Sequence, residues 1–554
     1  MRVQGPFARG PAILLFGILL LAVVTRLQGI GFGLPALYDP DEPLFALSAV
    51  KLLAERTLNP GWFGHPGTTT IYGLALVDIL VVGVSLLTGR FDSLHAITTA
   101  AYADPGILIL PGRVSIMLCG VASVYMTWRI GKRLGGEGAG LVAAGLLAIN
   151  AVHIAYSQII RTDIQASLFM LLCLNAAIGV AQTGRLRAYL VAGALAGAAC
   201  ATKWPAASVF VCVIGACTMR CAAQAGVAGG DRRGEIMRLA LSALAAVAAL
   251  LVISPYILID VHTVVANLSG EAQAHHVGAT GRGLAANLGW YLRRPLGGSM
   301  GAAGLVVAAA GMVLVLLRGG VARATLLPIA LLFFILISAQ TLIWERWAVP
   351  LLPLAALFTG LAVSALVTWA RAKGGRPAAL AVAAVMMAAL VPPAMSALAA
   401  RATERAHDTR ALASAWVRDH VPAGSRIVLE HLAFDLLDPK WTFLLPAGDR
   451  GCLEASGQLE AKAGPGALDS WRGKRAVVDF GTMDEGGLPS CRADFAVFSH
   501  YDRYKAEGAL YAREAARYER FVRGGRLRAT FRPEQDRIGG PFIRIVDLRG
   551  GRSR

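Results

Sequence analysis

The sequence predicts a polytopic α-helical membrane protein with a small α/β domain at its C-terminal end. Of its 554 residues, 56% are hydrophobic and only 16% are charged. Several apolar runs approach the roughly 20 residues that are needed to cross a bilayer. Near residue 400 the composition changes to that of a soluble domain. We therefore expect a transmembrane domain over residues 1–399 and an α/β domain over residues 400–554.

Eleven apolar runs are expected to cross the membrane. The first, about residues 11–29, follows Arg2 and Arg9, and no convincing cleavage site of small residues comes after it. We therefore interpret it as a retained helix rather than a signal peptide. The other runs cover about residues 111–130, 139–157, 165–182, 187–201, 205–220, 238–258, 300–317, 324–341, 348–370 and 377–398.

Charge decides how one further apolar run, about residues 69–88, lies in the membrane. This run has the length of a span but contains Asp78. If it does not cross, the basic loops between the later spans all face the cytoplasm, as the positive-inside rule requires; if it crosses, they all face outward. We therefore expect an interfacial or re-entrant helix in a first outer loop of about residues 31–110. The N-terminus is then inside, and residues 259–299 and the C-terminal domain are outside.

The net charge of +18 comes mostly from short loops between the apolar runs. Membrane topology and lipid headgroups explain this distribution better than nucleic-acid binding, so no nucleic-acid partner is expected. Of the eight cysteines, only Cys452 and Cys491 lie in the polar C-terminal part. If that part is outside the cytoplasm, the two either form a disulfide or remain free thiols.

Segments of the C-terminal part have the patterns of buried strands and amphipathic helices. The expected strands are residues 426–430, 475–479, 495–498 and 542–546, and the expected helices are residues 403–420 and 504–522. This part contains no glycine-rich nucleotide-binding motif and no catalytic triad pattern.

Acidic residues mark the outer ends of two spans. Asp41 and Glu42 follow the first span, and Asp163 begins a later one. An adjacent carboxylate pair can offer one group as a general base while the other orients a ligand. A helix cap or a surface ion pair is the alternative explanation for the pair, and a helix cap is the alternative for Asp163.

Basic residues stand at the same face. Arg113, Lys203 and Arg346 each lie at an outer end of a span, where they could hold a phosphate at headgroup level. The alternative is that their long side chains reach the interface without a specific partner. His65 precedes the expected interfacial helix, and it is either a site residue or an ordinary loop histidine.

Carboxylates and cations beside long apolar walls suit a lipid-linked phosphate substrate. A base would deprotonate an acceptor hydroxyl, and the cations would stabilise the departing lipid phosphate. A transporter or flippase for a lipid-linked saccharide is the main alternative, although it should place polar residues along a path through the bilayer. A non-catalytic scaffold that acts through its C-terminal domain is a third possibility.

The order of these motifs resembles the GT-C glycosyltransferases of the protein O-mannosyltransferase and aminoarabinose transferase type. The likeness covers roughly residues 10–370. It rests on Asp41-Glu42, His65-Pro66, Arg113, the Arg161-Thr162-Asp163 turn, the Thr202-Lys203 break and Trp344-Glu345-Arg346-Trp347. The C-terminal domain also looks like the extracytoplasmic domain of bacterial members. The Trp-Trp-Asp motif usual in oligosaccharyltransferases does not occur, which favours transfer of a single sugar.

This resemblance implies transfer of one sugar, with inversion, from a polyprenyl-phosphate donor to a glycan, lipid or protein outside the cytoplasm. Asp41 would be the general base, Glu42 would help to hold the acceptor, and Asp163 would shape the site. Lys203, Arg346 and Arg113 would bind the donor phosphate. His65, His275 and His276 are candidates for a donor, acceptor or divalent-metal contact. The expected location is the inner membrane of a bacterium, with the active site on the periplasmic side of this cell-envelope enzyme.

Overall fold

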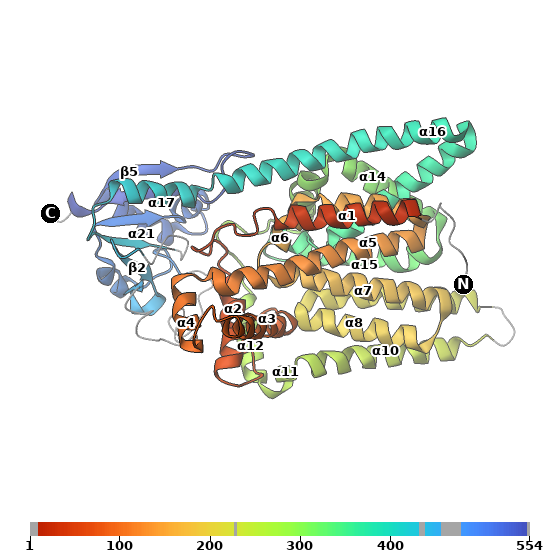
Figure 1. The fold of residues 1–554 in the computed structure, drawn as a ribbon, viewed down its shortest axis with the longest axis horizontal. Helices are drawn as coiled ribbons and strands as arrows, with labels where there is room; N and C mark the ends of the chain where they lie inside the picture. Colours follow the sequence, from red (N-terminus) through yellow and green to blue (C-terminus); the bar gives the residue numbers. More distant parts are fainter. Residues whose placement is uncertain (1–8, 226–229, 431–437, 456–477, 551–554) are drawn as a thin grey trace.

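The computed structural model describes residues 9–225, 230–430, 438–455 and 478–550. Long helices form a bundle, and a small domain built around a β-sheet lies at one end of it (Figure 1). Helix α1 (Arg9–Leu27) begins near the opposite end of the bundle (Figure 1). This arrangement agrees with the predicted polytopic helical domain followed by an α/β domain.

The long helices account for the eleven predicted crossings. They are α1 (Arg9–Leu27), α5 (Gly106–Ala148), α7 (Thr162–Thr183), α8 (Leu186–Thr202), α9 (Val211–Ala223), α10 (Arg232–Ile253), α14 (Gly297–Arg318), α15 (Gly320–Ser338) and α16 (Leu351–Ala406). Two of the predicted crossings lie within α5 and two within α16, and the stretch before α9 is the 3-10 segment η2 (Trp204–Phe210). In the described part of the chain, nine helical segments have at least 18 residues and are apolar enough to cross a membrane; they include Thr68–Leu87, whereas α8 is slightly shorter.

Glycines break α5 and α16 into pairs of helices. Gly136 in α5 has φ +85° and Gly375 in α16 has φ +71°, values at which other residues are strained. After Gly136 the chain folds back so closely that a Cβ atom on Gly140 would lie 2.5 Å from the carbonyl oxygen of Trp128. The second half of α16 then passes along the bundle and enters the soluble domain (Figure 1).

Helix α3 (Thr68–Leu87) corresponds to the apolar run predicted to be interfacial. It is seen nearly end-on in Figure 1, whereas α5, α7, α8 and α10 run along the bundle. Its apolar side chains are divided between two faces, because Ile71 and Leu74 are buried while Leu80 and Leu87 are exposed. A helix that lies across the bundle axis with one apolar face outward suits the membrane interface, as predicted.

Shorter helices complete the outer face of the membrane domain. They are α2 (Glu42–Ala54), α4 (Leu94–Ala103), α6 (Ala151–Ser157), α11 (Tyr256–Ile259), α12 (Val261–Glu271) and α13 (Leu284–Tyr291). Helices α2 and α3 pack on α5 through a small apolar cluster that includes Phe45, Ile71 and Ile109. This cluster positions the acidic stretch at the start of α2 above the bundle.

The soluble domain is a six-stranded mixed sheet with strand order β3-β2-β1-β4-β6-β5. The strands are β1 (Arg426–Leu429), β2 (Thr442–Pro446), β3 (Cys452–Glu454), β4 (Phe495–Phe498), β5 (Arg526–Phe531) and β6 (Ile543–Asp547). Strand β1 is parallel to both of its neighbours, β2 and β4. The pairs β2–β3, β4–β6 and β5–β6 are antiparallel. Helices α17 (Thr409–His420), α20 (Tyr501–Ala506) and α21 (Ala512–Arg523) complete the domain.

Three of the four predicted strands match β1, β4 and β6, whereas β2, β3 and β5 were not predicted. Of the predicted strand 475–479, residues 475–477 lie outside the described residues, and 478–479 are not in a strand. The predicted helix 504–522 is split into α20 and α21. The domain boundary predicted at residue 399 lies within α16, because this helix continues from the membrane to Ala406.

A disulfide joins Cys452 and Cys491 in the soluble domain, with an S–S distance of 2.05 Å. It closes a loop with a sequence separation of 39 residues. A cross-link of that length should stabilise the domain by about 4 kcal/mol through the unfolded state. We expect the double variant Cys452→Ser/Cys491→Ser to unfold at a lower temperature. Reductant should lower the melting temperature of the wild type and not that of the variant, and an equal effect on both would contradict the prediction.

Candidate active site

The acidic stretch before α2 is held by an arginine at the start of α7. Arg161 donates to Asp41 through Nη1, and to Asp39 through Nη2 at 2.8 Å and Nε at 3.0 Å. Asp41 occupies the N-cap position of α2, but its side chain makes no capping hydrogen bond. The geometry therefore does not support a helix cap as the reason for this carboxylate. Asp41 remains 31% exposed, so it is open to a ligand.

A second ion pair lies between α7 and the break that follows α8. The Nζ atom of Lys203 is 2.5 Å from Oδ1 of Asp163, and both side chains are largely buried. Asp163 lies in the first turn of α7, two residues after Arg161. The start of α7 therefore brings both ion pairs to the same region of the outer face.

Arg346 completes the group of charges. It belongs to the 3-10 segment η4 (Glu345–Ala348), and its Nη2 atom is 3.9 Å from Oδ2 of Asp41. Its guanidinium stacks on the ring of Trp344 at 4.3 Å. Its Nε atom is buried and has no hydrogen-bond partner among the described residues. Arg346 thus has a free donor beside Asp41.

These cations control the ionisation of Asp41. Burial alone would raise the pKa of its carboxyl, but the positive charges of Arg161 and Arg346 hold this pKa well below its ordinary value. The charge of Lys203 acts in the same direction. Asp41 is therefore a carboxylate at neutral pH.

His65 lies between α2 and α3 and faces the same charges. Burial, together with the positive charges of Lys203 and Arg346, lowers the pKa of His65 to about 3. The imidazole is therefore neutral at pH 7, and its buried Nδ1 atom has no hydrogen-bond partner among the residues that the structure describes. A neutral ring of this kind can accept or donate a hydrogen bond to a ligand.

Glu42 and Arg113, which were predicted from the sequence to bind acceptor and phosphate, form a buried pair. Arg113 donates to both carboxylate oxygens of Glu42, at 2.8 and 2.6 Å, and also to the carbonyl oxygens of Ile30 and Phe32. Glu42 also accepts from the backbone N–H of Ile160. Both side chains are at most 1% exposed, so this pair has no atom available to a ligand. The geometry therefore favours a structural role for both residues.

The other two predicted histidines lie in the loop after α12. His275 is exposed, whereas the ring of His276 packs edge-on against Trp344 at 4.9 Å. Among the described residues, the group that could hold a metal ion is Glu430, Asp479 and His500 in the soluble domain. The structure therefore does not gather the predicted histidines into a metal site.

A cavity of about 420 Å³ opens beside the Asp163–Lys203 pair. Its walls are mainly apolar and come from α7, η2, α15 and the segment that follows Arg346. The lining includes Trp204, Phe333, Leu336, Ile337, Trp347 and Pro350. An apolar groove with an ion pair at one end suits an amphipathic ligand that has an anionic head.

Several residues that stabilise the charged region around Asp41 and Arg346 had no role predicted from the sequence. Arg161 was noted only as part of a motif, and its contact with two carboxylates needed the fold. From the end of α16, Arg401 pairs with Glu345 beside Arg346, and Arg405 donates to Gln158. Only the high arginine content near residue 400 could have drawn attention to these contacts.

Comparison with known proteins supports the predicted class. Residues 106–259 match the family model of dolichyl-phosphate-mannose-protein mannosyltransferases. No curated protein sequence matches the chain. The fold is similar to that of ArnT from Cupriavidus metallidurans in the apo state, with TM-score 0.54 and 13% identity over 98% of both chains.

Two further structures share the fold. ArnT from Cupriavidus metallidurans bound to undecaprenyl phosphate gives TM-score 0.51 and 14% identity, over 96% of this chain and 98% of that one. The Archaeoglobus fulgidus oligosaccharyltransferase in complex with Zn and sulfate gives TM-score 0.51 and 13% identity, over 96% and 72% of the two chains. These likenesses confirm the predicted fold, a multi-pass helical membrane domain followed by a small sheet domain. The family match over residues 106–259 agrees with the prediction of a glycosyltransferase.

Proposed function

We propose that this protein transfers a single sugar, with inversion, from a polyprenyl-phosphate donor to an acceptor at the outer face of the membrane. The observation that carries the proposal is the apolar cavity with Asp163 and Lys203 in its lining. Asp41 and Arg346 form the neighbouring ion pair, at 3.9 Å. One region thus combines an apolar groove, cations for a phosphate and a carboxylate for a proton. The family match and the ArnT likeness support the same reaction.

In this proposal the groove receives the lipid, and the cations receive its phosphate. Lys203 would exchange its contact with Asp163 for the donor phosphate, and Arg346 would use its unpartnered Nε donor. Both charges then stabilise the negative charge that grows on the departing lipid phosphate.

Asp41 acts as the general base. Its carboxylate takes the proton of an acceptor hydroxyl while the hydroxyl oxygen bonds to the anomeric carbon of the sugar. The bond between that carbon and the phosphate oxygen breaks on the opposite face, and the lipid phosphate leaves with the bonding electrons. Configuration is therefore inverted. No step is assigned to a metal ion.

Donor binding should also make Asp41 a stronger base. Without donor, Arg161, Arg346 and Lys203 all lower its pKa. A bound phosphate offsets these positive charges, so the pKa of Asp41 rises towards its ordinary value.

We place the reaction on the periplasmic side of a bacterial inner membrane. The charge pattern of the loops supports this orientation, since the basic loops lie between spans on the side of the N-terminus. The disulfide of the soluble domain is consistent with an oxidising compartment.

The reaction can be tested directly in proteoliposomes that contain the purified protein. Lipid extract from the host supplies polyprenyl-phosphate sugars, and mass spectrometry follows the donor. A transferase should convert the donor to free polyprenyl phosphate and leave the sugar on an acceptor. A flippase would move the intact donor between leaflets without releasing polyprenyl phosphate, and that result would overturn the proposal.

A bulky side chain in the groove should block the donor. Ser208 lines the cavity, whereas its neighbour Ala207 is exposed and does not. We expect Ser208→Trp to raise the KM for the donor by at least about tenfold, a loss of roughly 1.4 kcal/mol of binding. Ala207→Trp should change this KM by less than about twofold. Similar KM values for the two variants would show that the lipid does not use this groove.

A further inference from the structure

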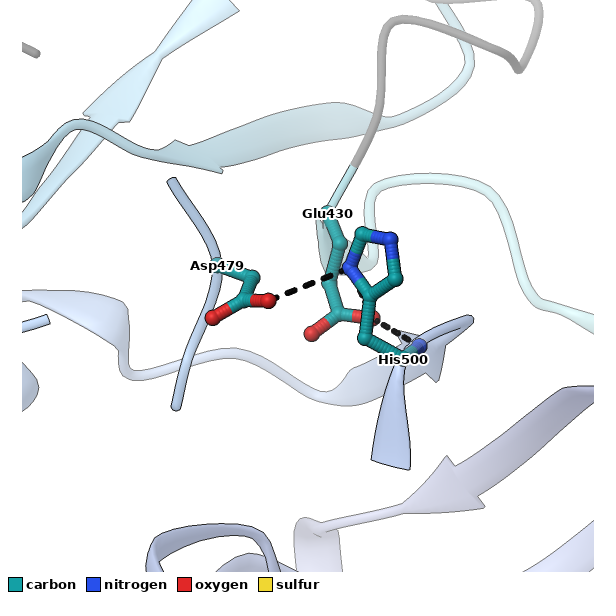
Figure 2. Close-up of side chains that lie close together, drawn as sticks. All are labelled: Glu430, Asp479 and His500. Carbon is teal, nitrogen blue, oxygen red and sulfur yellow. Dashed lines mark hydrogen bonds and ion pairs between the residues drawn. The ribbon is translucent and has the colours of Figure 1, made fainter. Parts of the chain in front are cut away.

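Three potential metal ligands come together inside the soluble domain. Figure 2 shows Glu430, Asp479 and His500 with their side chains directed towards one another. Their ligand atoms all lie within 4.8 Å of one another, and all three residues are buried. None of them belongs to the proposed transfer site in the membrane domain.

The sheet topology places this cluster where open α/β sheets bind ligands. From β1, the sheet continues to β2 on one side and to β4 on the other, and both pairings are parallel. The strand order therefore changes direction at β1, which is a topological switch point of the sheet. The carboxyl ends of parallel strands at a switch point form a crevice that commonly holds a ligand. Glu430 directly follows β1, and His500 lies two residues beyond β4.

Among the described residues, the cluster holds two carboxylates and one imidazole. Among the described residues, His500 is the only side chain that forms an ion pair with either carboxylate: its Nδ1 atom is 3.2 Å from Oδ2 of Asp479 and 4.0 Å from Oε2 of Glu430. Arg503 lies within electrostatic range of Glu430 but makes no ion pair with it. Two buried carboxylates against one imidazole would be balanced by a divalent cation.

Hydrogen bonds hold both carboxylates in place. The hydroxyl of Tyr518 and the backbone N–H of Ser499 each donate a hydrogen bond to the carboxylate of Glu430. Tyr504 donates to Asp479 at 2.9 Å, and the N–H of Thr482 donates at 2.9 Å to its other oxygen. Metal-binding carboxylates are oriented by outer partners of this kind.

We propose that Glu430, Asp479 and His500 bind a divalent metal ion, with Zn²⁺ as the best fit. One imidazole nitrogen and two carboxylate oxygens are ligands that zinc accepts. Two ligands in a tetrahedral zinc site lie about 3.4 Å apart when the bonds are about 2.1 Å long. The observed separations of 3.2 and 4.0 Å lie on either side of that value.

The metal would support the surface on which the soluble domain meets the membrane domain. Helix α20 begins directly after His500. Just beyond this helix, Glu507 accepts a hydrogen bond from the N–H of Gly278 in the loop after α12. Val277 of the same loop packs into the core that contains Tyr504 and Tyr518. The ion would therefore fix the ends of β1 and β4 beneath this contact.

The test uses the full-length protein in detergent, stripped with a chelator and then titrated with Zn²⁺. We expect one zinc ion per chain by elemental analysis, and a rise in the melting temperature of the wild type. His500→Ala should lower the zinc affinity by at least about tenfold. The control is His420→Ala, because His420 lies on α17, exposed and stacked on Trp416, and this variant should bind like the wild type.

If His500→Ala does not fold, Tyr518→Phe provides a second measurement. It keeps the ring and removes only the hydroxyl that donates to Glu430, so zinc affinity should fall by about tenfold. The proposal is overturned if zinc neither binds nor stabilises the wild type, or if His500→Ala binds as well as His420→Ala. Tighter binding of Mn²⁺ or Ca²⁺ by the wild type would overturn the choice of zinc. None of these readouts depends on sugar transfer.

Discussion

Asp41→Asn is expected to lower the turnover of sugar transfer by about 10²–10⁴-fold, the range that general base catalysis contributes. The amide keeps the size of the side chain and still accepts a hydrogen bond from Arg161, but it cannot take the acceptor proton. Donor binding should persist, because Lys203 and Arg346 are unchanged. The measurement is the rate of polyprenyl phosphate release in proteoliposomes, together with the KM for the donor.

Asp39→Asn is the matched control for this prediction. Asp39 also binds Arg161, but it uses both oxygens to do so and is less exposed than Asp41. Its loss should weaken the placement of Arg161 and lower turnover far less than loss of Asp41. If both variants lost turnover equally, Asp41 would be part of the charged framework and not the base.

The pH profile gives an independent check on Asp41. A base acts in its ionised form, and the neighbouring cations depress the pKa of Asp41. In the donor-bound enzyme Arg161 still donates to Asp41, so this pKa should stay near or below the ordinary value of about 3.9 for an aspartate. Titration of Asp41 should therefore cause no loss of turnover between about pH 5 and 7. In His65→Ala the profile should remain flat over this range, because His65, with a pKa of about 3, is already neutral there.

Arg113→Ala is expected to lower the free energy of unfolding by about 3–5 kcal/mol, the cost of leaving a buried charge without its partner. The substitution leaves the fully buried carboxylate of Glu42 without its bidentate partner and frees two carbonyl oxygens of the first outer loop. Unfolding of the purified protein in mixed detergent micelles measures the effect. Protease sensitivity of the first outer loop should rise in parallel.

Two variants control for this prediction. Arg523→Ala removes a pair with Glu519 that is largely exposed, so it should change stability by less than about 1 kcal/mol. The double variant Glu42→Leu/Arg113→Met should be more stable than Arg113→Ala, because it leaves no unpaired buried charge. If Arg113→Ala kept full stability but lost donor binding, Arg113 would have the phosphate role predicted from the sequence.

Much of the fold was predictable because membrane insertion depends on local properties. Lengths of apolar runs and the charges of the loops between them set the number of crossings and the orientation. The same reasoning predicts that α3, which is long and apolar enough to cross, lies at the membrane interface instead. In the soluble domain the predicted strands β1, β4 and β6 are largely buried, whereas β5, with mostly exposed residues, has no apolar pattern to reveal it.

The candidate site was predicted only as a set of residues at one face. Asp41 and Glu42 are adjacent in the chain, yet Asp41 contacts Arg161 at a partly open site while Glu42 is buried against Arg113. Sequence position cannot distinguish them, because the direction of each side chain is set by how α2 packs on α5 and α7. Similarly, Arg113 and Arg346 looked equivalent, but only Arg346 keeps an unpartnered donor among the described residues.

The sequence by itself predicted the class of protein, an orientation in the membrane and the face on which we place the chemistry, since hydrophobicity and charge act along the chain. Tertiary structure alone decided which charges pair and which stay available. It also decided where metal ligands meet, because Glu430, Asp479 and His500 come from segments with no recognisable spacing. Such partners are chosen by the packing of distant segments, where burial makes an unpaired charge costly.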